Sequence, residues 1–144
     1  MKPIFQLPVD SALTRAVSEE WGLLPLRVPA GWHVISNALD ARRLPDGRVE
    51  ANDSQDLYWA RTLAPPWLHA EQGAETSNLR VREIHLDVGW YVFGFRVVVL
   101  APDWDHVHAT YTTADLDDLV ATIEKWMEMI TLQGRLPESW ASVR

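Results

Sequence analysis

"VREIHLDVGWYVFGFRVVVLA", residues Val81–Ala101, is the stretch of sequence that decides the fold. In its first part an apolar residue occupies every second position, at Ile84, Leu86 and Val88, and polar residues fill the positions between. This period of two predicts a β-strand with one buried and one solvated face. The last part, "FGFRVVVLA", is almost continuously apolar, which is typical of a central strand covered on both faces. The stretch therefore predicts the middle of a β-sheet.

The flanking segments predict further strands of the same sheet. "LYWARTL" (Leu57–Leu63) is a short strand, and "HVHATYT" (His106–Thr112) again alternates between polar and apolar residues. "GWHVISNALDARRLPDGRVEAN" (Gly31–Asn52) is typical of a hairpin, with "PDG" at Pro45–Gly47 supplying the turn. We expect an antiparallel sheet of about five strands.

Two helices are expected, one of them long. Before it, Thr112 or Thr113 can serve as N-cap, and Gly134 follows it where a C-cap belongs. Between these ends one apolar stripe recurs at helical spacing, formed by Leu116, Leu119, Val120, Ile123, Met127 and Ile130. A shorter helix is expected over Ser11–Trp21, ending at Gly22. The expected fold class is α+β, with the long C-terminal helix packed on one face of the sheet.

The length predicts one domain over residues 1–144. Its expected parts are an N-terminal helix and irregular segment (1–30), the sheet and C-terminal helix (31–134), and a tail (135–144). No internal repeat is present.

Composition narrows the possible functions. The formal net charge of −7 disfavours nucleic acid as a partner and favours a basic protein partner. The absence of cysteine excludes disulfides, thiolate nucleophiles and cysteine-ligated zinc. No apolar run is long enough for a signal peptide or a membrane span, so we expect a cytoplasmic protein without a membrane partner.

"APDWDHVH" (Ala101–His108) places two aspartates and two histidines around one tryptophan. His106 and His108 are two residues apart in an expected strand, so both imidazoles would point to one face and could bind a metal ion. A third ligand could come from His85 or Asp103. Local spacing fixes no such ligand, however, and the interpretation we favour is the solvated face of a strand. We expect no metal and no cofactor.

Other candidate sites have equally plain alternatives. Asp103 and Asp105 could be a catalytic carboxylate pair, but an acidic loop after Pro102 is the simpler interpretation. "GWY" (Gly89–Tyr91) is either an aromatic ligand platform or part of the core. The segment Ala64–Asn78 is expected to be a solvated acidic loop. Phosphate-binding glycine loops, nucleophile elbows and metalloprotease motifs are all absent from the sequence.

Several aromatic landmarks occur in a recognisable order. They are "GWHVISN" (Gly31–Asn37), "DLYWARTL" (Asp56–Leu63), "LDVGWYVFGFRVVVL" (Leu86–Leu100), Trp104 and "IEKW" (Ile123–Trp126). In this order the chain resembles small bacterial immunity proteins that guard against polymorphic toxins, including those of contact-dependent growth inhibition. The sequence departs from the family after "GWY", where apolar Val92 and Phe93 replace an expected proline and polar turn.

The resemblance implies an inhibitor and not an enzyme. Such a protein would bind a cognate toxin domain, expected to be a cationic nuclease, and occlude its active or substrate-binding site. The expected binding residues are exposed acids and aromatics in loops: Glu71, Glu75, Asp103, Trp104 and Asp105. The alternative is a small metal-dependent or ligand-binding enzyme that uses His85, His106 and His108. An oligomeric adaptor whose tryptophans pack a homodimer interface is a third hypothesis.

Overall fold

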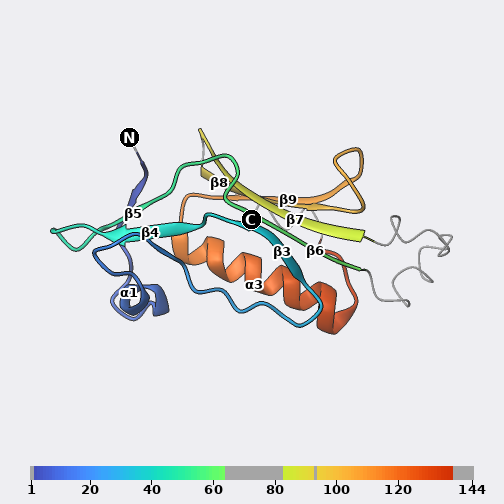
Figure 1. Ribbon diagram of the computed structural model, residues 1–144, viewed down its shortest axis with the longest axis horizontal. Coiled ribbons are helices and arrows are strands. Elements are labelled where there is room, and N and C mark those ends of the chain that lie inside the picture. The colour runs from blue at the N-terminus through green and yellow to red at the C-terminus, as the bar shows by residue number, and fades with distance from the viewer. Residues whose placement is uncertain (1, 64–82, 93, 138–144) are drawn as a thin grey trace, which may run out of the picture.

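The computed structural model of the chain describes residues 2–63, 83–92 and 94–137. They form two antiparallel sheets, of five and four strands, with a long C-terminal helix under the larger sheet (Figure 1). This arrangement confirms the α+β fold class with the C-terminal helix packed on one face of a five-stranded sheet. The second sheet was not expected.

The larger sheet has the strand order β3-β6-β7-β8-β9. Its strands are β3 (His33–Asn37), β6 (Tyr58–Leu63), β7 (Glu83–Tyr91), β8 (Gly94–Leu100) and β9 (Val107–Thr113). β7 is therefore central, and its alternation is confirmed: Ile84, Leu86 and Val88 are buried, whereas the residues between them are half-buried. In β8 every residue except Arg96 is buried, as its apolar run predicts.

Helix α3 (Leu116–Gln133) covers one face of this sheet. All six residues of the predicted apolar stripe are buried, and Trp126 joins them. Gly134 ends the helix in the left-handed conformation that favours glycine, with φ of 63°. The N-cap prediction was wrong, because β9 continues to Thr113 and Asp115 accepts the N–H of Asp117 instead. No helix in the described ranges is both apolar and long enough to cross a membrane.

The four-stranded sheet has the order β1-β5-β4-β2 and lies beside one end of the larger sheet (Figure 1). Its strands are short: β1 (Ile4–Phe5), β2 (Gly22–Leu23), β4 (Asp40–Arg43) and β5 (Val49–Ala51). Phe5 stacks on Phe95 of β8, with ring centroids 5.6 Å apart. Buried residues of both sheets and of α3 belong to one hydrophobic cluster, so they share a core.

The predicted hairpin over Gly31–Asn52 is only half present. β4 and β5 pair with each other around the "PDG" turn, in which Gly47 has φ of 88°. β3, however, pairs with β6 in the other sheet. The chain crosses from one sheet to the other at Ala38–Leu39, where Leu39 is buried in the shared core.

The first helix is also shorter than expected. α1 spans Ala12–Ala16 behind the N-cap Ser11, and Val17 already has an extended conformation. The segment that follows satisfies its backbone groups by strand pairing: the Ser18 carbonyl accepts the N–H of Arg43 at 2.6 Å, and Gly22 pairs with Ala41. Sheet pairing therefore replaces the last helical turns.

Candidate functional site

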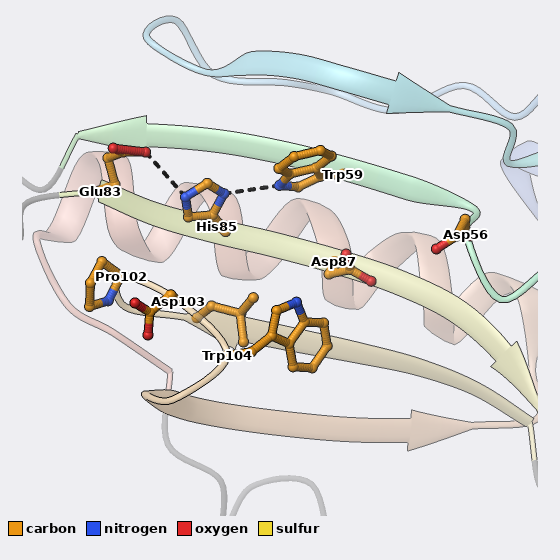
Figure 2. A pocket seen from close by; sticks show the side chains of 9 residues that line it. Asp56, Trp59, Glu83, His85, Asp87, Pro102, Asp103 and Trp104 are labelled. Atoms are coloured by element: carbon orange, nitrogen blue, oxygen red, sulfur yellow. Dashed lines mark hydrogen bonds and ion pairs between the residues drawn. The ribbon is translucent and has the colours of Figure 1, made fainter. Parts of the chain in front are cut away.

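The face of the larger sheet opposite α3 carries a pocket of about 560 Å³. It forms there because strands alternate: residues next to the buried positions of β6 and β7 point away from the helix. Figure 2 shows the pocket between β6, β7 and the loop that joins β8 to β9. Its lining consists of Asp56, Trp59, Glu83, His85, Asp87, Leu100, Pro102, Asp103 and Trp104. Four carboxyl groups and two indoles therefore meet in one cavity.

One end of the pocket is formed by the segment that precedes β6. This segment is held against β7 by two backbone hydrogen bonds, from Leu57 N–H to Val88 O and from Trp90 N–H to Ser54 O, both at 2.9 Å. Such close approach requires Gly89, because a Cβ atom at this position would overlap the carbonyl oxygen of Gln55. Gly89 thereby allows the segment to bring Asp56 to the pocket.

A hydrogen-bonded row crosses the pocket from β6 to β7 (Figure 2). The indole N–H of Trp59 donates to Nδ1 of His85 at 2.9 Å, and Nε2 of His85 lies 3.3 Å from Oε1 of Glu83. Because the indole N–H can only donate, Nδ1 of His85 accepts, and Nε2 is the ring nitrogen that donates to Glu83. Arg61 lies 3.5 Å from the same carboxylate oxygen of Glu83. These contacts fix the orientation of the Trp59 ring.

Asp87 is in the middle of the sheet, between Trp59 on β6 and Val98 on β8. Burial beside these apolar neighbours, followed by repulsion from Asp56, raises the pKa of Asp87 to about 6. Within the described ranges neither of these two carboxylates forms an ion pair with a lysine or arginine. The centre of the pocket therefore holds two carboxylates that no lysine or arginine of the described residues compensates.

The loop between β8 and β9 closes the other side. Asp103 organises it, because its carboxylate accepts the backbone N–H of Asp105 at 3.1 Å and lies 2.8 Å from Nδ1 of His106. Trp104, at the tip of the loop, is 59% exposed although it lines the pocket. An exposed tryptophan beside carboxylates is typical of a binding surface.

The structure brings together only some of the predicted binding residues. Asp103 and Trp104 line the pocket, whereas Asp105 does not. Glu71 and Glu75, like the whole Ala64–Asn78 loop, lie outside the described residues.

The three candidate metal ligands do not come together. His85 lines the pocket, but His106 and His108 do not, and His106 precedes β9 instead of belonging to it. His108 is the extra residue of a β-bulge, since Val107 pairs with Leu100 and Ala109 with Val99. Among the described residues no group of three or more His, Asp or Glu side chains could hold a metal ion.

Sequence reasoning missed Asp56, Trp59 and Asp87 as site residues. Alternation placed Asp87 on the polar face of its strand but could not show that neighbouring strands bury it. "GWY" belongs to β7, and its partly buried Trp90 packs edge-on against Phe95 at 4.8 Å, so this tryptophan lies against the core.

Comparisons with known proteins identify no relative of this chain. No protein-family model matches the sequence, and neither the curated proteins nor the solved structures contain a match.

Replacing Asp87 by asparagine should stabilise the protein at neutral pH. The folded-state pKa of about 6 lies above the ordinary value of 3.8, so the folded chain loses stability as the pH rises through this window and Asp87 ionises. Asparagine avoids that loss. We expect a gain of about 1 kcal/mol at pH 7.5, after allowing for solvent screening, that shrinks as the pH falls from 6 to 4. Urea unfolding at each pH measures it.

Asp46→Asn is the matched control, because the pKa of Asp46 is shifted in the opposite direction. Hydrogen bonds from Arg48 lower the pKa of Asp46, so ionised Asp46 is favoured in the folded chain and its loss should not stabilise the protein at pH 7.5. A lower stability of Asp87→Asn than of the parent at pH 7.5 would contradict the assignment of an uncompensated carboxylate.

Gly89→Ala should displace the segment that carries Asp56. The added Cβ must push the Gln55 carbonyl away, which should cost about 1–3 kcal/mol of stability. Because Asp56 would then move away from Asp87, the pKa of Asp87 should fall. Carboxyl ¹³C NMR titration measures this pKa. Gly22→Ala is the control, since no atom lies within 4 Å of a Cβ built there, and an equal effect of both substitutions would refute the explanation.

Proposed function

We propose that this chain is an immunity protein that binds a cognate toxin domain in the bacterial cytoplasm and occludes its active or substrate-binding site. The observation that carries the proposal is the acidic pocket with Trp59 and Trp104 in its lining. The landmark order from Gly31 to Trp126, which resembles immunity proteins of polymorphic toxins, supports the same function.

The negative charge of the chain and of its pocket supports a basic partner, such as a nuclease domain. The chain has a net charge of −7, and the pocket adds a local concentration of carboxylates. Long-range attraction between an acidic inhibitor and a cationic toxin accelerates their encounter, which an inhibitor needs when the toxin is already inside the cell.

The open face of the larger sheet is the proposed interface. Trp59 and Trp104 are 40% and 59% exposed there, although both are large enough to bury considerable area against a partner. Exposed aromatics next to polar groups are the residues on which protein interfaces depend most. Among the described residues, α3 packs on the other face of this sheet.

A second candidate function, catalysis on a small molecule in the same pocket, is favoured by one observation. Asp87 has a pKa of about 6 next to a second carboxyl group, Asp56, and such pairs serve general acid–base catalysis near neutral pH. A metal-dependent form of this alternative would require stoichiometric metal in the purified protein that disappears in a His85→Ala variant.

The immunity proposal predicts that a toxin domain is encoded next to this gene, and that domain is the partner with which the proposal is tested. Co-expression of the chain should protect cells from that domain. In a binding assay with a catalytically inactive toxin domain, Trp104→Ala should weaken binding by about 2 kcal/mol, or roughly thirtyfold in Kd. Trp21→Ala is the matched control, because Trp21 is also exposed but packs with Lys2 and Arg42 away from the pocket.

The two parts of the proposal fail separately. Cell death despite co-expression would overturn the immunity function. Protection combined with unchanged binding of the Trp104→Ala variant would leave the function in place and show that the toxin binds elsewhere.

A further inference from the structure

Among the described residues, the positive charges beside the pocket balance only part of its negative charge. Glu83 has Arg61 at 3.5 Å and accepts from His85, and Asp103 lies 2.8 Å from His106. Asp56 and Asp87 have no comparable cation in the described ranges and repel each other. A cationic ligand would relieve this repulsion and compensate the desolvation of Asp87.

The two tryptophans in the lining of the pocket favour a planar cation. Trp59 comes from β6 and Trp104 from the loop after β8, and Asp87 on β7 lies between them (Figure 2). Trp59 is held in one orientation by its hydrogen bond to His85. Indole faces attract cations and stack with planar ones, so two indoles beside carboxylates form a site for a delocalised positive charge.

Arginine fits these features better than lysine. Its guanidinium is planar, stacks on aromatic rings and presents five N–H donors that can reach two carboxylates at once. The lysine ammonium is a compact, strongly hydrated charge whose transfer into a partly buried site costs more. The cavity of about 560 Å³ has room for an arginine side chain and for part of its neighbours in the partner.

We propose that the pocket receives an arginine side chain of the partner protein, which stacks against Trp104 or Trp59 and donates hydrogen bonds to Asp87 and Asp56. This inference rests on the proposed function, because the partner is the toxin domain. It makes the arginine the anchor of the interface and the pocket the determinant of its specificity.

The isolated chain and short peptides test the inference without any toxin. The probes are three acetylated and amidated tripeptides, Gly-X-Gly, in which X is arginine, lysine or citrulline. Citrulline keeps the planar shape of arginine but lacks its charge. Binding is followed through the indole ¹H–¹⁵N NMR signals of the tryptophans, with Trp59 and Trp104 assigned by Trp→Phe variants.

We expect the arginine peptide to shift the signals of Trp59 and Trp104, with a Kd in the millimolar range. The lysine peptide should bind at least about threefold more weakly and the citrulline peptide at least about tenfold more weakly. Asp87→Asn should weaken binding of the arginine peptide about tenfold, whereas Asp46→Asn, the same charge change on the β4–β5 turn, should not.

Three results would overturn the inference: no shift with the arginine peptide, equal binding of the citrulline peptide, or binding that Asp87→Asn leaves unchanged. Arginine binding in a chain that fails to protect cells would disprove only the immunity function. Protection without arginine binding would disprove only the arginine anchor.

Discussion

The alternation of β7 is the constraint on which the rest of the structure depends. Leu86 and Val88 must point toward α3, since the shared core lies there, and the intervening side chains must therefore point the other way. A shift of one residue in register would exchange the two sets and destroy both the core and the pocket. The same register therefore forms the core and places the candidate site. His85 and Asp87 point into the pocket because they alternate with buried residues of β7.

The polar side chains on the pocket face of β7 differ in the hydrogen-bond and charge partners that the described residues give them. His85 has partners on both ring nitrogens, which join Trp59 to Glu83 in one hydrogen-bonded row. Asp87 lies two residues further along β7, on the same face, and is desolvated without a cation within the described ranges. A hydrogen-bonded indole beside a desolvated carboxylate is the arrangement expected where a protein is pre-organised for a ligand and accepts a loss of stability for it.

Periodicity predicted the parts of the fold that depend on local pattern. The stripe from Leu116 to Ile130 and the strands β6 to β9 follow directly from apolar spacing. The second sheet could not be predicted, because β1 and β2 have two residues each and show no period. The pairing of β3 with β6 could not be predicted either, because alternation does not show which neighbouring strand a strand pairs with. Of the site, composition indicated Trp104, whereas the burial of Asp87 depends on cross-strand neighbours.

The packing of Phe5 against Phe95 and Trp90 has a consequence for where the domain begins. β1 and β2 form the two edges of the smaller sheet, and the side chain of Ser11 is hydrogen-bonded to Asp117 near the start of α3. A fragment that starts at Gly31, just before β3, would expose aromatic surface of the core and would remove both edge strands from β4 and β5. The smallest fragment able to fold independently therefore includes the N-terminal segment. This segment supplies both edge strands of the smaller sheet and packs Phe5 against the larger one.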